Sequence, residues 1–570
     1  MKRVRLVGKQ PPAAGMINMT TFAEKIMEMA TADRIELFHL MAFHEKPSTE
    51  AQQMISSCGQ LFPKDKLMEG RRREMMNLAH FGVATLVRRD RLPKGTRIIS
   101  TRWEEKWKGE DVRSRFVARD YRHLDPKRED IFAATPTDTG LLILLALAAS
   151  KRHVIRTGDL TTAFMHADLQ EEIYVEGPEG FIEDGWVWKL NKALNGLRRS
   201  PLDFQDFIAG VLTREMGFTR LTMDAMVFKH SSRDLVVDIH VDDPIALGPS
   251  NDVSWFFDTA SKYMLLRADD EVKVGDEFKY LGRRYLRTES GFRRMAGAGY
   301  IEHTIELAGF RDLKPANTPG VASAKQSEED PVLDESDHRR RLYPTVVGRL
   351  LFLAGDRPDI QYSVKELART LHAPTEYSWA QLKRCLRYLQ GTRDFCYDIK
   401  AGHELPEYID VIVDANWATC QKTRKSTSGV HILWGGVLLR SLSRTQSTVA
   451  LSSGESEFGA ISLGIVESLY IKNFLAELGI DIKIRIFSDS SAGRAMIQRL
   501  GPGRLKHLEI KALYAQQTLK DHQIKVLPIS TLDNSADLGT KYLPVDTHIK
   551  HCRRLGLYAK LFEDGGKLPP

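Results

Sequence analysis

Cysteine is scarce in this sequence, and no two cysteines stand in a C-x-x-C spacing. The five that are present are spread along the chain at Cys58, Cys385, Cys396, Cys420 and Cys552. A zinc knuckle or a disulfide framework needs cysteines at short, regular spacings, so neither is expected. Scattered single cysteines are typical of proteins in a reducing compartment.

Long hydrophobic runs are also missing. The most apolar stretch, GLLILLALAAS at residues 140–150, is too short to span a bilayer and predicts a buried helix. The first 23 residues are basic and free of acids, but they contain no apolar core of a secretion signal. We therefore expect no secretion signal and no association with a membrane.

The length of 570 residues exceeds what one hydrophobic core supports and predicts three to four domains. The net charge of +7 permits binding to nucleic acid without requiring it. Arginines cluster at residues 71–73, 113–122 and 339–341, where a solvated surface and a nucleic-acid contact are equally good interpretations.

Acids interrupt two strand-like runs in the first half of the chain. Asp159 ends a short run that begins at Val154, and the run TTAFMHADL that follows is expected to be helical. Asp242 and Asp243 lie inside LVVDIHVDDPIAL at residues 235–247. Buried acids are costly unless a cation neutralises them. A hairpin that brings the three together would hold hard divalent cations, which serve phosphoryl transfer when two are present.

A second set of acids lies in the last third of the sequence. The expected order of elements from residue 405 is β-β-β-α-β-α-β-α. The acids stand at a strand end, a helix start, a strand end and a late helix: Asp414, Glu457, Asp489 and Asp537. Glu455 is the alternative to Glu457 in the helix. Four converging carboxylates would repel one another unless divalent ions bind.

The motifs around both sets of acids resemble those of copia-type LTR retrotransposons. GDLTTAFMHADLQEEIYVEGPEGF and HVDD resemble the reverse transcriptase, and D-A-N-W, R-K-S-T-S-G, S-D-S and N-x-A-D-x-x-T-K resemble the ribonuclease H. The resemblance covers about residues 71–545. It implies an α+β and α/β multidomain fold, a right-hand polymerase followed by a connection and a ribonuclease H fold. The implied parts are a spacer of unknown role (1–70), fingers and palm (71–250), the end of the palm and the thumb (251–320), an acidic linker and helical connection (321–400), ribonuclease H (401–550) and a tail (551–570).

The resemblance implies an RNA-directed DNA polymerase with ribonuclease H activity, which copies element RNA into DNA by two-metal phosphoryl transfer. Two Mg²⁺ ions per site are expected, with Mn²⁺ as a substitute. The expected partners are an RNA template, a DNA primer, an RNA–DNA hybrid and deoxynucleoside triphosphates. The expected location is the cytoplasm or a virus-like particle, and the nucleus. The residues expected to act in catalysis and to bind metal are Asp159, Asp242, Asp243, Asp414, Glu457, Asp489 and Asp537.

The family also suggests residues that position nucleotide and template. Arg115 and Arg119 lie on an expected basic hairpin that turns at Lys108 and Gly109. Phe164 stands five residues after Asp159, where an aromatic blocks the 2′-hydroxyl of a ribonucleotide, although an ordinary core position is the alternative. A positioning loop is expected to contain Gly196, Ser200 and Pro201. Glycine there allows a close approach of the backbone.

Several positions depart from the family pattern. Asn195 and Phe204 replace a usual Tyr and Trp, His240 replaces an aromatic, and Pro244 follows the paired acids and removes a backbone donor. These departures leave the hairpin geometry and turnover in doubt. The alternative is therefore a decayed or domesticated copy that binds nucleic acid without efficient polymerisation.

The remaining motifs have weaker interpretations. Lys383, Arg384 and Arg387 share one expected helical face, which is either solvated or in contact with nucleic acid. His507 is expected to be a surface residue, with a role in product release as the alternative. No integrase, aspartic protease or capsid motif is found, so we expect part of a polyprotein or a separate reading frame. The oligomeric state is open.

Overall fold

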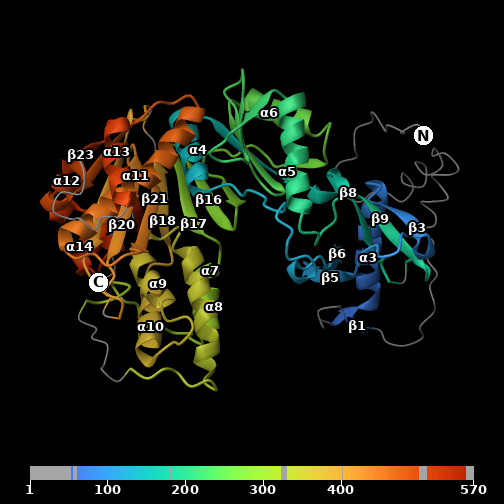
Figure 1. Cartoon of the computed structure of the whole chain (residues 1–570), viewed down its shortest axis with the longest axis horizontal. Coiled ribbons are helices and arrows are strands. Elements are labelled where there is room, and N and C mark those ends of the chain that lie inside the picture. Colours follow the sequence, from blue (N-terminus) through green and yellow to red (C-terminus); the bar gives the residue numbers. More distant parts are fainter. Residues whose placement is uncertain are drawn as a thin grey trace.

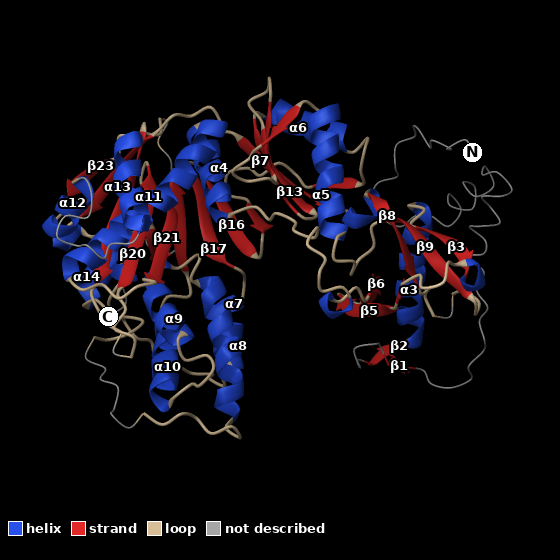
Figure 2. Ribbon diagram, viewed as in Figure 1, coloured by secondary structure: helices blue, strands red, loops and turns tan. Residues whose placement is uncertain are grey.

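The structure is a computed structural model that describes residues 53–55, 61–179, 181–322, 330–400, 402, 404–420, 422–499 and 510–559. Most of the expected spacer at 1–70, and His507, lie outside the described residues. Figure 1 shows the chain as an arch, with the first elements in blue at one end and the last in red at the other. Both ends of the arch contain helices and strands (Figure 2).

The first lobe contains a four-stranded sheet in the order β3-β9-β8-β4 and a separate β5–β6 hairpin. The hairpin pairs from Thr101↔Ala118 to Lys108↔Asp111, which confirms the expected turn at Gly109. The elements are β1 (Gln53–Ile55), β2 (Leu61–Pro63), α3 (Lys64–His80), β3 (Ala84–Arg88), β4 (Ile98–Ile99), β5 (Thr101–Lys108), β6 (Asp111–Ala118), β8 (Asp168–Val175) and β9 (Trp186–Lys192).

A six-stranded sheet follows, in the order β10-β11-β12-β13-β7-β14. Its elements are β7 (Val154–Leu160), α5 (Ser200–Gly210), β10 (Phe218–Arg220), β11 (Val227–His230), β12 (Val236–His240), β13 (Asp243–Gly248), α6 (Ser250–Ala260) and β14 (Leu266–Ala268). Alternate side chains of β13 point to opposite faces, as the period of a strand requires. Ala246 packs in the core formed with α5 and α6. Ile245 and Leu247 pack in a different core, which contains helix α4 (Asp138–Ser150).

The run after β7 was expected to be helical and is not. Only Ala163–His166 form a short 3-10 turn, η3, and the chain continues directly into β8. Thr162 before this turn has a positive φ of 53°, so the backbone changes direction there. Asp168 and Ile173–Val175 of β8 pair with β9, and this pairing outweighs the local helical propensity.

The apolar stretch at 140–150 forms the buried helix α4 (Asp138–Ser150), as expected. Thr137 caps it by accepting a hydrogen bond from Gly140 N. The helix packs against β13 on one side. On the other side it packs against three strands of the second half of the chain, β17 (Gly291–Ala296), β18 (Phe395–Lys400) and β21 (Val437–Thr445). It is apolar all round because it is enclosed on every side.

A five-stranded sheet in the order β15-β16-β17-β18-β24 joins distant parts of the sequence. Its strands are β15 (Glu277–Tyr280), β16 (Arg283–Thr288), β17 (Gly291–Ala296), β18 (Phe395–Lys400) and β24 (Leu557–Ala559). The expected tail at 551–570 is therefore corrected: its described part, 551–559, contains the end of α14 (Val545–Arg554) and the edge strand β24. These residues are ordered because Phe395, Cys396 and Tyr397 pair with them.

Four helices form a separate apolar core that stands below this sheet in Figure 1: α7 (Tyr300–Leu307), α8 (His338–Leu353), α9 (Gln361–Ala368) and α10 (Glu376–Gly391). The expected thumb helix α7 thus belongs with the helices expected as the connection. Lys383, Arg384 and Arg387 of α10 are engaged within the protein. Arg384 and Arg387 donate hydrogen bonds to Thr318, Lys314 and Pro315, and the ammonium of Lys383 lies 5.2 Å from the centre of the Phe310 ring.

The last sheet has the order β21-β20-β19-β22-β23, with β19, β22 and β23 parallel to one another. The order of elements from residue 405 is the expected one except that two helices, and not one, lie between β22 and β23. The elements are β19 (Tyr408–Asn416), β20 (Thr427–Trp434), β21 (Val437–Thr445), α11 (Ser453–Glu477), β22 (Lys483–Ser488), α12 (Ser491–Gln498), α13 (Ile510–Asp521) and β23 (Lys525–Pro528).

Helix α11 contacts both halves of the protein. By length and composition it is the one helix among those described that could cross a membrane, but 56% of its most apolar window is buried inside the protein, as in a core helix. The hydroxyl of Tyr470 lies 2.6 Å from that of Thr137, and the carboxylate of Glu477 accepts a hydrogen bond of 2.7 Å from Thr222 N. These contacts fix the last sheet against the six-stranded sheet.

Candidate active sites

The first candidate site is the turn between β12 and β13. The ladder pairs Val236↔Leu247 through His240↔Asp243, so Val241 and Asp242 form a two-residue loop. Val241 has a φ of 57°, a left-handed conformation that a β-branched residue rarely adopts. Backbone strain of this kind is concentrated at functional sites.

The expected hairpin therefore forms despite Pro244. That proline pairs with Ile239 in the β12–β13 ladder, and the β13–β7 ladder begins one residue later, at Ile245. A proline costs little where its missing N–H faces no ladder partner. Pro244 therefore does not prevent β12 and β13 from forming the hairpin.

The strand that carries Asp159 meets this turn. Leu160 N donates a hydrogen bond of 2.7 Å to Asp242 O, and Asp159 itself is exposed at the end of β7. Asp243 is half-buried, and its pKa is raised to about 6 by burial and by the negative charges of Asp242, Asp159 and Asp269. The structure thus places the three predicted acids at one edge of the sheet.

Asp269 is an acid that the sequence motifs did not identify. It follows β14, accepts a hydrogen bond of 2.7 Å from Thr157 Oγ1, and adds its charge to that around Asp243. The only sign of this acid in the sequence is the acidic run R-A-D-D-E at residues 267–271, a pattern that is also typical of a solvated loop.

Two further acids lie behind the hairpin, inside the protein. Asp238 in β12 is fully buried, and its two oxygens have no hydrogen-bond partner. Burial and the nearby charge of Asp224 raise its pKa well above the usual range. Next to them, the buried Tyr280 donates a hydrogen bond of 3.2 Å to Asp243 O, so a polar interior supports the turn.

The residues expected to position nucleotide and template are close to the first lobe. Phe164 is half-buried in η3, and its ring centre lies 6.1 Å from that of Phe204, edge to face. Arg115 and Arg119 are half-buried, with Arg115 opposite Glu104 in the hairpin. Phe164 therefore packs against Phe204, and part of its side chain remains accessible to solvent.

The positioning loop packs directly on the β5–β6 hairpin. Gly196 has a φ of 87°, and a Cβ there would lie 2.1 Å from Ala118 O, so only glycine fits. Ala118 N donates a hydrogen bond of 2.8 Å to Asn195 O. Ser200 is fully buried and donates to Leu194 O at 2.7 Å, and Pro201 lies in the first turn of α5. Ser200 thus holds the loop from inside.

The second candidate site lies at the end of β19. Asp414 is buried opposite Gly429 in the ladder, and its carboxylate accepts a hydrogen bond from the hydroxyl of Thr540. A Cβ at Gly429 would lie 2.4 Å from Ala536 O. The absence of a side chain at this glycine lets the 3-10 turn η7 (Ser535–Gly539), which contains Asp537, approach Asp414.

Glu457 joins this site from the second turn of α11. It is 9% exposed, and its Oε2 atom has no hydrogen-bond partner. Burial and the charges of Asp414 and Asp489 raise its pKa to about 8. Glu455 instead lies in the first turn, where its carboxylate accepts a hydrogen bond of 2.9 Å from Leu451 N. The structure therefore brings Glu457, and not Glu455, to the other acids.

Asp489 and Asp537 complete the second site. Asp489 follows β22 and accepts a hydrogen bond of 2.9 Å from Thr531 Oγ1. The ligand atoms of Asp414, Glu457 and Asp489 all lie within 4.8 Å of one another. Asp537 is 5% exposed, and burial together with Asp414 raises its pKa to about 7. Carboxylates held this close fit a hard divalent cation, and the partnerless oxygen of Glu457 supports that fit.

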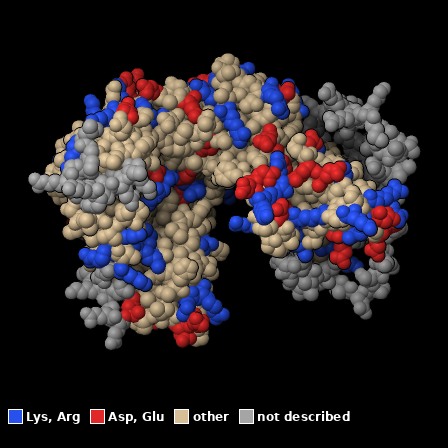
Figure 3. Space-filling model, viewed as in Figure 1, with Lys and Arg blue, Asp and Glu red and all other residues tan. Residues whose placement is uncertain are grey.

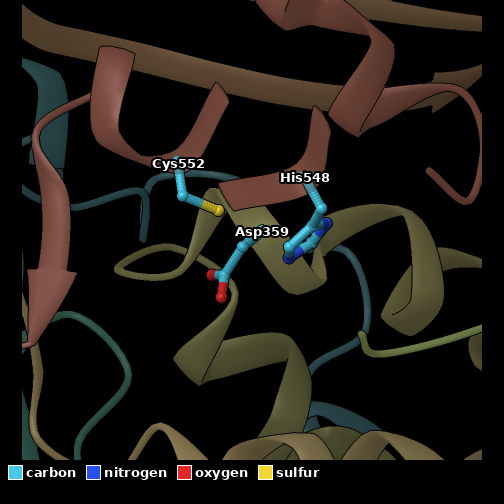
Figure 4. Close-up of side chains that lie close together, drawn as sticks. All are labelled: Asp359, His548 and Cys552. Atoms are coloured by element: carbon cyan, nitrogen blue, oxygen red, sulfur yellow. The ribbon is translucent and has the colours of Figure 1, made fainter. Parts of the chain in front are cut away.

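A third buried group lies between α14 and the short turn η5 (Pro358–Ile360). Figure 4 shows His548 and Cys552 on one helix and Asp359 opposite them, with ligand atoms within 4.8 Å of one another. The carboxylate of Asp359 is already occupied, because Arg357 donates to both of its oxygens and Tyr388 OH donates at 2.6 Å. We interpret this group as a polar contact that fixes α14 on η5.

Comparisons with known proteins identify relatives of this chain. The family described as "Reverse transcriptase (RNA-dependent DNA polymerase)" matches residues 83–322. The Pol polyprotein of transposon TNT 1-94 from Nicotiana tabacum is 29% identical over 500 residues, 84% of this chain and 37% of that protein. The Pol polyprotein of transposon RE1 from Arabidopsis thaliana is 28% identical over 471 residues, which cover 79% of this chain and 31% of that protein. A foamy viral protease–reverse transcriptase structure aligns with a TM-score of 0.48 at 12% identity, over 92% of this chain and 84% of that one.

The matched segment includes the whole six-stranded sheet and its three acids, and this part of the chain is a reverse transcriptase domain. The chain belongs to the Pol polyproteins of copia-type retrotransposons. It spans about a third of the length of the polyproteins it matches, 37% and 31% in the two cases above.

Proposed function

We propose that the chain copies RNA into DNA at the first site and cleaves the RNA strand of the resulting hybrid at the second. The observation that carries the proposal is the presence of two separate groups of acids at strand ends in one chain, the first of them inside the matched reverse transcriptase segment. The finer assignment is fingers for the first lobe, palm for the six-stranded sheet, thumb and connection for α7–α10, and ribonuclease H for the last sheet.

Asp159, Asp242 and Asp243 would hold the divalent cations of polymerisation, and Asp414, Glu457, Asp489 and Asp537 those of RNA cleavage. Such cations, magnesium above all, lower the pKa of an attacking hydroxyl or water and neutralise the leaving group. In the first site the carboxylates fix the position of the primer end at the edge of the sheet. The strained turn at Val241 keeps Asp242 at that edge.

The remaining residues of the first site bind and select the nucleotide in this proposal. The guanidinium groups of Arg115 and Arg119 would bind triphosphate or template phosphates through charge-assisted hydrogen bonds. The ring of Phe164 would exclude a ribose 2′-hydroxyl by its bulk. The loop at Gly196 packs against the β5–β6 hairpin, which carries Arg115.

The shape of the molecule suits a long nucleic acid. Figure 3 shows a deep hollow under the arch, between the helices α7–α10 and the lobe that carries the β5–β6 hairpin, with Lys and Arg visible on both walls. Backbone phosphates would supply most of the binding free energy, so the affinity for an RNA–DNA hybrid should fall steeply with salt.

One observation favours the second candidate function, a decayed copy that binds nucleic acid without efficient polymerisation. Among the described residues, the acids of the first site do not form a group whose ligand atoms all lie within 4.8 Å of one another, whereas three acids of the second site do. Primer extension on an RNA template with Mg²⁺ or Mn²⁺, next to cleavage of hybrid RNA, separates the two functions. Extension supports the polymerase, and cleavage without extension supports the decayed copy.

A further inference from the structure

The four acids of the second site are divided into two subsites. Asp414, Glu457 and Asp489 form the compact group whose ligand atoms lie within 4.8 Å of one another. Asp537 is outside that group and is paired with a side chain that has no assigned role, Lys541. The Lys541 Nζ atom lies 2.7 Å from Asp537 Oδ1 and 3.8 Å from Asp414 Oδ2.

The position of Lys541 is built into the fold. Asn416 at the end of β19 donates a hydrogen bond of 3.0 Å to Thr540 O, and Asn534 donates one of 3.1 Å to Val413 O. These two amides clamp the segment around η7 onto β19, on both sides of Asp414. The side chain of Lys541 is 39% exposed, so its ammonium lies where the acids meet solvent.

The ammonium and a divalent cation would compete for the same two carboxylates. A cation held by Asp414 and Asp537 has to lie near the oxygens that Lys541 now contacts, and two positive charges a few ångströms apart repel strongly in a partly buried site. In the compact group the ammonium of Lys541 approaches Asp414 only to 3.8 Å, and the Oε2 atom of Glu457 has no hydrogen-bond partner.

We infer that Lys541 is a resident counter-cation that holds the subsite of Asp414 and Asp537 and makes its affinity for a second divalent ion weak. This inference rests on the proposed ribonuclease function of the second site. The first ion binds at Asp414, Glu457 and Asp489. The second ion binds when the ammonium moves out toward solvent, where it meets the phosphates of a bound hybrid. Binding of substrate thus favours loading of the second ion.

The test measures binding of Mn²⁺ to the full chain without nucleic acid, by electron paramagnetic resonance. The wild-type protein is expected to bind one ion tightly at the second site and another at least tenfold more weakly. In Lys541→Met the weaker ion should bind about tenfold more tightly. Lys541→Gln also removes the charge and should show the same increase in affinity. Lys541→Arg keeps the charge and should resemble the wild type. The first site remains the same in all variants, so its ions cancel in the comparison.

Two outcomes overturn the inference: unchanged Mn²⁺ binding in both Lys541→Met and Lys541→Gln, or tighter binding in Lys541→Arg as well. Asp537→Asn serves as a matched control, because it should remove the weaker ion and keep the tight one. The readout is independent of catalysis. If the wild-type chain never cleaves hybrid RNA but the Mn²⁺ affinities change as expected, the ribonuclease function fails and the role of Lys541 in metal loading stands.

Discussion

The two groups of acids solve the same electrostatic problem in different ways. At the first site Asp159 is exposed, Asp242 lies in a strained turn, and the half-buried Asp243 has its pKa raised to about 6 by burial and by the neighbouring acids. At the second site Asp414, Glu457 and Asp537 are buried together, and the negative charge of the group is reduced by the raised pKa values of Glu457 and Asp537 and by the ammonium of Lys541. The comparison teaches that both sites raise the pKa of a carboxyl group, whereas the more deeply buried second site also places an ammonium group beside its acids.

The largest expected effect tests whether the two sites act independently. Asp242→Asn should reduce DNA synthesis at least 100-fold and leave RNA cleavage within about twofold, because metal-ligand carboxylates act only on their own site. Asp489→Asn should do the reverse. Both activities are measured on the same full-length preparations. Loss of both activities in either variant would show that the sites are coupled.

A second substitution pair sharpens the assignment within α11. Glu457→Gln should reduce RNA cleavage about 100-fold, because it removes a charge from the group around Asp414. Glu455→Gln is the matched control. It should cost only a few-fold, since Glu455 contacts Leu451 N at the start of the helix. The reverse order of effects on the cleavage rate would move the site to Glu455.

The buried acids also predict a dependence of stability on pH. The pKa of Glu457 is raised from 4.5 to about 8, so between these values the folded protein retains a proton that the unfolded chain has released. The free energy of unfolding therefore falls as the pH rises through this window, and the Tm in EDTA should drop by several degrees between pH 5 and pH 8. Mg²⁺ should restore most of the loss at pH 8. In Glu457→Gln the drop in Tm should be smaller, and an equal drop would contradict this account.

Selection of the sugar tests the first site alone. Phe164→Ala should increase ribonucleotide incorporation roughly tenfold. This is on the order of the change in substrate discrimination that a small change in the size of a binding pocket produces. Use of deoxynucleotides should change little. Phe204→Leu, in the neighbouring core position, is a control that loosens packing without opening the space under the sugar. If Phe164→Ala and Phe204→Leu alter discrimination equally, the role of Phe164 is packing.

The smallest effect concerns the strained turn. Val241→Gly relieves the left-handed conformation at φ 57° and should raise the free energy of unfolding by up to about 1 kcal/mol. Val236→Gly in the adjoining strand is the matched control and should lower it by a similar amount. A destabilised Val241→Gly would show that the turn is not strained.

Local features of this fold were predictable from the sequence because they depend on short-range patterns. The apolar run at 140–150 forms a buried helix, and the glycine at 109 turns a hairpin. The elements from residue 405 follow the expected order apart from one additional helix. The helical interpretation of the run after Asp159 was wrong, because pairing with β9 outweighs local propensity there.

Long-range features were not predictable in the same way. The boundary at residue 401 does not separate two cores, since α4, β18 and the last sheet share one hydrophobic core. No periodicity in residues 557–559 indicates that they pair with Phe395, Cys396 and Tyr397. Asp269 lies at the first site because β14 pairs with β7 in antiparallel orientation, and the sequence does not specify this pairing. Residues 401–570 alone would lack the partner strand of β24, so the experiments above use the full chain.

The pairing of β24 with β18 has a consequence for how the protein is made. Residues 557–559 leave the ribosome long after β15, β16 and β17 have formed, so the nascent chain exposes an unpaired sheet edge at Phe395–Lys400 until synthesis has passed residue 559. Such an edge is an opening for pairing with other chains. Copies interrupted late in translation should therefore aggregate, and only chains completed through this strand would accumulate as soluble protein.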